Sequence, residues 1–265
     1  MTIFAVIFFI LGLVIGSFLN VVIYRYNTQK SFGGRSACMS CRTQLHWYEL
    51  VPLFSYLGLK GRCRSCQTKI SAQYPLVEFL TGILFLVLFF KFKDILYQDT
   101  LMFIIPYAFY TAIFSLLLVI TVYDIKHKII PDVLSFVFGV LAFLSVFLFI
   151  DGVFYPHMPV ISDFFGAFVI SVPFALIWLL SRGTWMGLGD AKLAVGLGLL
   201  LGMPLMLSAT VMAFWIGAII GIFLLIFNKK YNRKSEVPFG PFLILGTLIA
   251  FLCELEIYQL LNIFN

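Results

Sequence analysis

The sequence predicts an all-α polytopic integral membrane protein with about eight transmembrane helices and one polar loop module. Of its 265 residues, 62% are hydrophobic and only 11% are charged, and the mean hydropathy is +1.05. Soluble domains are about half apolar and about a quarter charged, whereas a membrane-spanning helix needs about 20 mostly apolar residues. The composition therefore excludes an ordinary globular enzyme, a disordered chain, a disulfide-stabilised secreted module and a nucleic-acid-binding domain as descriptions of the whole chain.

Long apolar runs mark the expected helices. They lie near residues 3–24, 75–92, 101–123, 132–150, 161–181, 190–202, 204–227 and 242–262. The first run lacks a basic start and a small-residue cleavage site, so we interpret it as a retained helix and not as a signal peptide. The run 190–202 is short and glycine-rich, and the sequence leaves open whether it is separate from 204–227. No internal repeat is evident.

The basic residues predict the orientation of the helices, because short cytoplasmic loops are enriched in Lys and Arg. The segment 25–74 carries eight of the eighteen, and further basic residues follow at 126, 128, 182, 192 and 229–234. In an eight-helix arrangement only Lys91 and Lys93 fall on the opposite side. We therefore expect the large first loop to be cytoplasmic. Its positive charge favours contact with acidic membrane lipids over a nucleic-acid partner.

Four cysteines in the first loop form two CxxC pairs. Cys38 and Cys41 make the first pair, Cys63 and Cys66 make the second, and 21 residues separate the pairs. Two such turns can direct four thiolates at one tetrahedral Zn²⁺ ion, and thiols stay reduced in the cytoplasm. The pattern predicts a structural zinc site. A redox-active pair is the main alternative, and a catalytic zinc is disfavoured because four thiolates leave no open coordination position.

Acidic residues inside or beside apolar segments are costly and are therefore candidate functional groups. Glu78, Asp124, Asp132 and Asp190 are such residues, and all four are expected near the cytoplasmic face. Asp132 follows a proline at a helix start, which favours a role as a helix cap. Glu78 is expected to pair with a basic side chain such as Lys192.

Asp124 and Asp190 fit a different role. Asp190 ends the turn Gly187-Leu188-Gly189-Asp190, in which two glycines allow a sharp bend. Asp124 ends an otherwise apolar run. If the two side chains meet, they form an aspartyl-protease dyad in which two carboxylates share one proton. The helix dipole favours the anion at Asp190 and disfavours it at Asp124, so we expect Asp124 to hold that proton. Two unrelated acids at helix ends remain the alternative.

Taken together, these segments resemble the bacterial type IV prepilin peptidases, which are bifunctional leader peptidase/N-methyltransferases of the GxGD aspartyl-protease group. The resemblance covers nearly the whole chain. Besides the two CxxC pairs, it includes GSFLNVVIYR at 16–25, WYELVPLFSYLGLKGRC at 47–63, YPLVE at 74–78, YDIKHKIIPD at 123–132, GLGDAK at 187–192 and PFGP at 238–241.

The resemblance implies a division into a first helix at 1–24, a zinc loop and methyltransferase region at 25–74, and an aspartyl-peptidase domain at 75–265. It implies catalytic roles for Asp124 and Asp190. It also implies that Cys38, Cys41, Cys63 and Cys66 bind zinc.

The expected substrates are prepilins and pseudopilins of type IV pili and type II secretion. The expected site of action is the cytoplasmic side of the bacterial inner membrane. The implied methyl donor is S-adenosylmethionine, for which Glu49 and Gly61 are candidate contacts. An exposed acid and a turn glycine are the alternative interpretations of these two residues.

Three other functions stay open at the level of the sequence. A peptidase without methyltransferase activity would use the zinc loop only as structure. An ion or solute transporter would place its acids along a path through the membrane, whereas here they cluster at one face. A zinc-dependent scaffold would leave both aspartates as helix caps.

Overall fold

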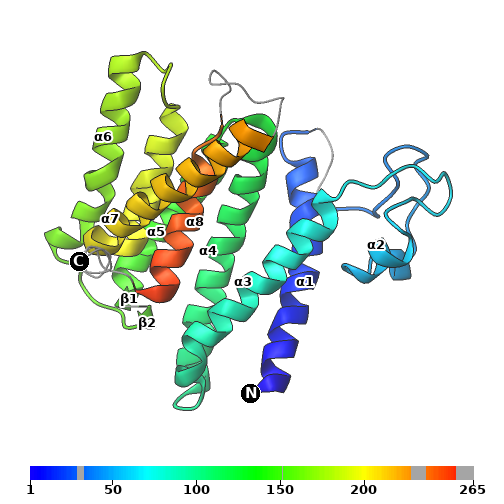
Figure 1. The fold of residues 1–265 in the computed structure, drawn as a ribbon. Coiled ribbons are helices and arrows are strands. Elements are labelled where there is room, and N and C mark those ends of the chain that lie inside the picture. Colours follow the sequence, from blue (N-terminus) through cyan, green and yellow to red (C-terminus); the bar gives the residue numbers. More distant parts are fainter. Residues whose placement is uncertain (29–32, 151, 228–236, 255–265) are drawn as a thin grey trace. The chain divides into compact units, whose positions relative to one another are not determined.

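The computed structural model describes residues 1–28, 33–150, 152–227 and 237–254, and it divides into two compact units (Figure 1). The first unit is Met1–Phe103 and the second is Ile104–Asn265. Several of the basic residues that predicted the orientation, namely Lys30 and the cluster Lys229, Lys230, Arg233 and Lys234, lie outside the described residues.

The first unit is built on α1 (Thr2–Arg25) and α3 (Gln73–Leu96), which pack side by side. The two backbones approach closely at Gly16, where a Cβ atom would lie 2.7 Å from the Glu78 Cα. Small residues commonly allow such approaches between membrane helices. Near the other end of α1, the Phe8 and Phe89 rings stack with their centroids 4.9 Å apart. The buried Asn20 amide donates a hydrogen bond to the Tyr74 carbonyl at 3.0 Å, which ties the end of α1 to the start of α3.

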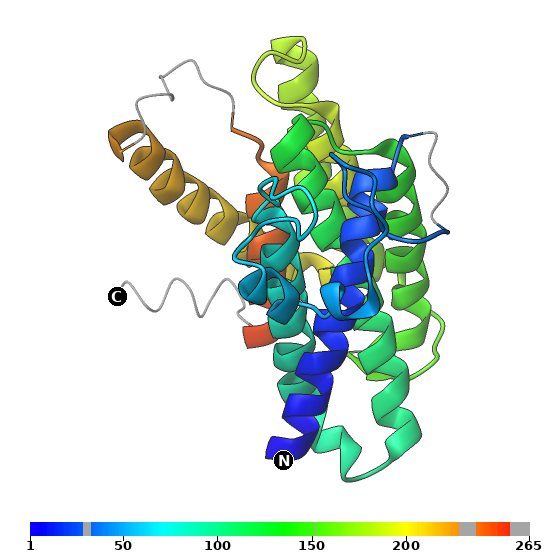
Figure 2. The same cartoon turned by 90° about the vertical axis from the view of Figure 1, so that its right-hand side faces the viewer.

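A polar loop module joins α1 to α3 (Figures 1 and 2). It contains a short 3₁₀ helix, η1 (Trp47–Glu49), and a one-turn helix, α2 (Phe54–Gly58). The module is anchored to α3 because the Leu53 backbone N–H donates a hydrogen bond to Glu78 Oε2 at 2.9 Å. Glu78 thus has a backbone partner within its own unit, and Lys192, the side chain expected to pair with it, forms an ion pair with an acid of the second unit.

The second unit is a helical bundle. It comprises the remainder of α4 (Thr100–His127), α5 (Asp132–Leu148), α6 (Phe165–Ser181), α7 (Leu188–Phe227) and α8 (Gly240–Cys253). A small hairpin of β1 (Phe149–Ile150) and β2 (Val153–Phe154) follows α5, and the 3₁₀ helix η2 (Ile161–Phe164) precedes α6. Aromatic contacts join α4 to α8, with Phe251 lying 4.6 Å from Tyr110 and 5.3 Å from Phe114 between ring centroids.

The helices of the second unit alternate in direction. As a result, α4 and α6 end, and α5, α7 and α8 begin, at the same end of the bundle (Figure 1). Polar residues at these termini can therefore meet although they are far apart in the sequence.

The helical membrane class is confirmed, but the exact count of eight spans is not. Five described helical segments are long and apolar enough to cross a membrane: Thr2–Arg25, Gln73–Leu96, Thr100–His127, Ile161–Ser181 and Leu188–Phe227. Helices α5 and α8 are apolar but shorter, with 17 and 14 residues.

The expected spans 190–202 and 204–227 belong to one element, α7, which has a non-helical break at Gly202. At this residue φ is 72° and ψ is 173°, and Pro204 follows closely. The break coincides with the boundary expected from the sequence. One other boundary differs, because 149–150 form β1 instead of the end of a helix. The end of the predicted span 242–262 lies outside the described residues.

Candidate functional site

Asp124 and Asp190 lie where α4 ends and α7 begins. Asp124 is in the last turn of α4, and Asp190 is in the first turn of α7. Both residues are nearly enclosed, with 4% and 9% of their surface exposed. A buried carboxylate is costly unless it is paired or functional, so their burial in the second unit distinguishes them from ordinary surface acids.

The two carboxylates converge on Gly240, the first residue of α8. A Cβ atom at Gly240 would lie 2.7 Å from Asp124 Oδ2 and 3.6 Å from Asp190 Oδ1. Helices α4, α7 and α8 thus each contribute one residue to this site. The sequence predicted the two aspartates as a possible pair but not Gly240 as their neighbour; its position in the PFGP motif was the available signal.

Packing against Ile130 also shapes this site. A Cβ atom at Gly189 would lie 3.0 Å from the Ile130 Cβ, which is tighter than most real contacts. Gly189 therefore allows the start of α7 to approach the segment between α4 and α5. This approach places Asp190 next to Asp124 and gives the second glycine of the Gly-Leu-Gly-Asp turn a packing role.

Asp132 does not belong to the converging pair. It was expected to cap α5, but the cap position is Pro131 and no side chain caps that helix. Asp132 instead accepts a hydrogen bond from Lys192 Nζ at 2.6 Å, in an ion pair whose side chains are 75% and 48% exposed. The pair lies outside the enclosed site.

The four predicted cysteines come together in the loop module. Their sulfur atoms all lie within 4.8 Å of one another, with Cys38 to Cys66 at 3.8 Å and Cys41 to Cys63 at 4.0 Å. A tetrahedral Zn²⁺ with Zn–S bonds of about 2.3 Å requires S···S separations of about 3.8 Å. The donor set and its geometry fit a structural zinc ion.

The two cysteine turns have the same backbone conformation. In the first turn the Cys38 N–H donates to the Thr43 carbonyl, and in the second the Cys63 N–H donates to the Thr68 carbonyl, at 3.0 and 2.9 Å. The fifth residue of each turn has a positive φ, 58° at Arg42 and 58° at Gln67. The module thus contains a structural repeat that the sequence analysis missed, although CMSCRT and CRSCQT carry its signal.

In each turn one cysteine sulfur is within hydrogen-bonding distance of a threonine hydroxyl. The Thr43 hydroxyl lies 3.3 Å from the Cys41 sulfur, and the Thr68 hydroxyl lies 3.2 Å from the Cys66 sulfur. Hydrogen bonding to the side chain and backbone of Thr68 lowers the pKa of Cys66 to about 6. The thiolate, which is the form that binds metal, is thereby favoured at neutral pH.

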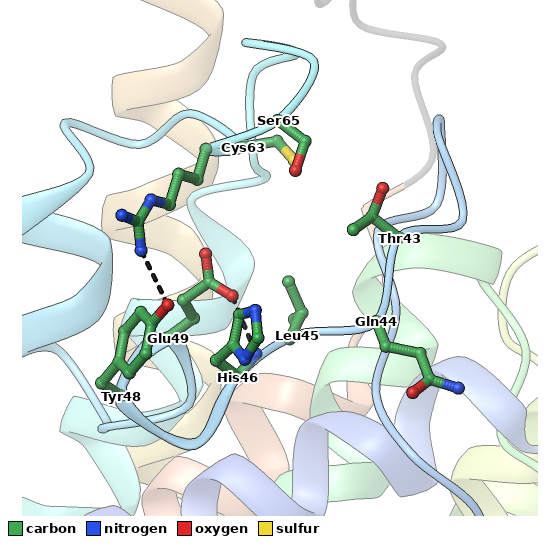
Figure 3. A pocket seen from close by; sticks show the side chains of 9 residues that line it. Thr43, Gln44, Leu45, His46, Tyr48, Glu49, Cys63 and Ser65 are labelled. Atoms are coloured by element: carbon green, nitrogen blue, oxygen red, sulfur yellow. Dashed lines mark hydrogen bonds between the residues drawn. The ribbon is translucent and has the colours of Figure 1, made fainter.

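A cavity of about 410 Å³ adjoins the cysteine cluster (Figure 3). Its lining comes from residues 43–46, 48–49 and 63–65, so Cys63 belongs to both the cluster and the cavity wall. Figure 3 shows Glu49 and His46 near the centre of this group and Tyr48 on its flank. Glu49, a predicted cofactor contact, therefore lies in a cavity.

Gly61, the other predicted cofactor contact, is not among the cavity-lining residues. Its φ is +66°, and a Cβ atom there would lie 2.9 Å from the Tyr56 hydroxyl oxygen. A side chain is disfavoured at this position on both grounds. The turn and its packing thus account for a glycine without reference to a ligand.

Comparison with known proteins places both parts of the chain in one family. Residues 10–92 match the bacterial peptidase A24 N-terminal domain, and residues 111–222 match the type IV leader peptidase family. The first match contains the cysteine module, and the second contains Asp124 and Asp190. None of the solved structures gives a significant match.

Curated relatives extend the similarity over almost the full chain. A prepilin leader peptidase/N-methyltransferase of Myxococcus xanthus (strain DK1622) is 35% identical, over 88% of this chain and 67% of the relative. Proteins of the same name from Neisseria gonorrhoeae and Bacillus subtilis (strain 168) are 30% and 31% identical. These alignments cover 96% and 93% of this chain, and 92% and 93% of the relatives. The chain therefore belongs to the type IV leader peptidase family, together with the prepilin leader peptidase/N-methyltransferases.

Proposed function

We propose that the chain is a membrane aspartic endopeptidase that removes the leader peptide of prepilins and pseudopilins and then methylates the new N-terminus. The observation that carries the peptidase assignment is the convergence of Asp124 and Asp190 on Gly240 in a member of this family. Family membership and the names of the relatives support the methyltransferase assignment.

In the proposed reaction one aspartate acts as a base and the other as an acid. The ionised carboxylate takes a proton from a water molecule, whose oxygen then bonds to the scissile carbonyl carbon. The protonated carboxyl donates its proton to the carbonyl oxygen. Collapse of the intermediate breaks the C–N bond, and a proton passes to the leaving amine. Asp124 and Asp190 would alternate in these roles, with the resting proton on Asp124.

The second reaction uses the amine released by the first. The amine would accept a methyl group from the donor and lose one proton, and S-adenosylhomocysteine would be the other product. S-adenosylmethionine, when bound, supplies the activated methyl group. We assign this reaction to 25–74, with zinc on the four cysteines as a structural element, and assign cleavage to 75–265.

Both reactions are proposed to occur at the cytoplasmic face of the bacterial inner membrane, with cleavage after a glycine that precedes the substrate's apolar helix. The enclosed aspartates lie at an end of the second unit, in the last turn of α4 and the first turn of α7. This position suits cleavage of a substrate bond at the edge of the membrane. The basic residues near these helix ends support a cytoplasmic placement of the aspartates. They are Lys126, Lys128, Arg182 and Lys192. Prepilin-type substrates and membrane lipids are the expected partners.

Cleavage by the purified full-length protein in detergent tests the peptidase assignment. The substrate is a peptide with a basic leader, a glycine and an apolar segment that begins with Phe. We expect wild-type protein to cut after the glycine, and Asp124→Asn and Asp190→Asn each to lower the rate by at least about 1,000-fold.

Asp132→Asn is the matched control, because Asp132 is an acid at the same end of the bundle but outside the pair. It should cut at the wild-type rate. Cleavage at the wild-type rate by Asp124→Asn and Asp190→Asn, when both retain the wild-type thermal unfolding midpoint, would refute the dyad. Mass spectrometry of the product tests whether a methyl group is added, and its absence would leave a peptidase with a purely structural zinc loop.

A further inference from the structure

The cavity beside the cysteine cluster contains oppositely charged side chains in a fixed arrangement. Arg64 Nη1 donates to the Tyr48 hydroxyl at 2.7 Å, and the guanidinium lies 5.5 Å from the centroid of the same ring. Glu49 is half-buried, and its Oε2 accepts the His46 backbone N–H at 2.8 Å. Both charged groups are therefore oriented before any ligand binds, which lowers the entropic cost of binding.

The cavity also offers an aromatic surface. The His46 and Tyr48 rings stack with centroids 5.3 Å apart and an interplanar angle of 8°. Such a pair presents a flat face on which a purine can stack. With a volume of about 410 Å³, the cavity is in the range of sites that hold small cofactors, about 300–1,000 Å³.

We infer that this cavity is the binding site for the nucleoside methyl donor, an inference that rests on the methyltransferase activity in the proposed function. Arg64 pairs with the carboxylate of the donor's amino-acid part, and Glu49 pairs with its ammonium group. The adenine stacks on the His46–Tyr48 pair. No donor to Glu49 Oε1 is found within the described part of the chain, so that oxygen can accept from a ligand.

The cysteine cluster gives this cavity its shape. Cys63 and Thr43 line the cavity, while Cys63 is one of the four clustered thiols and Thr43 contacts the Cys41 sulfur. A zinc ion bound there would hold the segments 43–49 and 63–65 together. Zinc and the methyl donor would thus occupy adjacent sites, with the metal fixing the walls and taking no part in the transfer.

The test measures binding separately from catalysis. The zinc-loaded full-length protein is titrated in detergent with S-adenosylhomocysteine, the unreactive product of the donor. Loss of a charged hydrogen bond typically costs about 1.5–3 kcal/mol, so Glu49→Gln and Arg64→Ala should each raise Kd by about tenfold or more. Every variant is checked for retained zinc by metal analysis.

Two charge-matched controls come from the same unit. Asp94→Asn removes an exposed acid near the end of α3, and Arg62→Ala removes an exposed base that does not line the cavity. Both should bind S-adenosylhomocysteine as the wild type does. If Glu49→Gln or Arg64→Ala loses zinc, wild-type protein is instead irradiated with tritiated S-adenosylmethionine. The label should map to 43–49 or 63–65 and be competed by S-adenosylhomocysteine.

Label at other segments, or unchanged Kd values in zinc-loaded Glu49→Gln and Arg64→Ala, would overturn the site. Methyl transfer by the wild type in that case would leave the proposed function standing. A wild-type protein that neither binds S-adenosylhomocysteine nor transfers a methyl group would overturn both the site and the methyltransferase part of the proposed function.

Discussion

Gly240 lies directly against the Asp124 carboxylate, so that a Cβ atom at this position would come within 2.7 Å of Asp124 Oδ2. A contact this short forces a movement of either the carboxylate or the start of α8. The first residue of α8 therefore sets the space in which Asp124 and Asp190 can approach each other.

Gly240→Ala should reduce peptide cleavage by about 100-fold, because displacing a reacting group by about 1 Å can cost this much. The binding of S-adenosylhomocysteine should not change, since the proposed donor site is in the first unit. Gly139→Ala, also at a helical glycine but with nothing within 4 Å of the added Cβ, is the control and should cleave normally. Wild-type activity in Gly240→Ala would show that the dyad tolerates the shift.

The ion pair between Asp132 and Lys192 should contribute little to stability. Both side chains are well exposed, at 75% and 48%, and exposed pairs contribute about 0.2–1 kcal/mol. Lys192→Ala should therefore lower the thermal unfolding midpoint in detergent only slightly and leave cleavage intact. A loss of cleavage comparable to that of Asp190→Asn would place Lys192 within the catalytic machinery.

Zinc removal should separate the two proposed activities. Cys63→Ser breaks both the thiolate cluster and the wall of the cavity, so metal content, donor binding and methylation should all fall together. Cleavage should fall much less, because Asp124, Asp190 and Gly240 belong to the second unit.

Cys253→Ser is the matched cysteine control, because Cys253 is in α8 and not in the cluster. It should retain zinc and both activities. Full methylation by zinc-free Cys63→Ser would contradict a shaping role for the metal.

The lowered pKa of Cys66 predicts how the metal-free thiol reacts with iodoacetamide. Only the thiolate is nucleophilic, so alkylation should be fast at neutral pH and should decline as the pH falls through about 6. Thr68→Val removes the hydroxyl beside the sulfur and should move the midpoint to higher pH. Mass spectrometry of the alkylated peptides measures the pH midpoint of Cys66 alkylation.

Thr43→Val is the counterpart in the first turn. Hydrogen bonding to Thr43 lowers the pKa of Cys41, so this variant should change the alkylation of Cys41 and leave the Cys66 midpoint in place. An unchanged Cys66 midpoint in Thr68→Val would mean that the hydroxyl does not stabilise the thiolate.

The hydrogen bond from Leu53 to Glu78 should protect the Leu53 amide from hydrogen exchange. Leu53 has a positive φ of 59°, which is unfavourable for leucine and must be held by its surroundings. Glu78→Ala removes the acceptor, at a cost of about 1–3 kcal/mol, and should speed exchange in the peptide around Leu53. Glu78→Gln keeps an acceptor oxygen and should retain most of the protection. If both variants exchange the Leu53 amide at the wild-type rate, this contact does not anchor the module.

The helical membrane class and the cysteine cluster could be predicted from local sequence because their causes are local. A long apolar run predicts a membrane helix whichever helices pack against it. A CxxC turn likewise directs two thiols to one point whatever surrounds it. The short, glycine-rich run 190–202 marked the place where α7 breaks at Gly202, but the sequence left open whether this run is separate from 204–227. The repeat of the two cysteine turns was missed because only the cysteines, serine and threonine recur.

The sequence by itself determined that this chain is a bundle of apolar helices with acids at helix ends and four thiols in one loop. Only the tertiary structure decided that Gly240 faces Asp124, that Glu49 lines a cavity and that Gly61 does not. The physical reason is that lipid-facing and buried helix positions are equally apolar. Hydrophobic patterning therefore leaves the rotation of each helix undetermined, and that rotation decides which residues of distant segments meet.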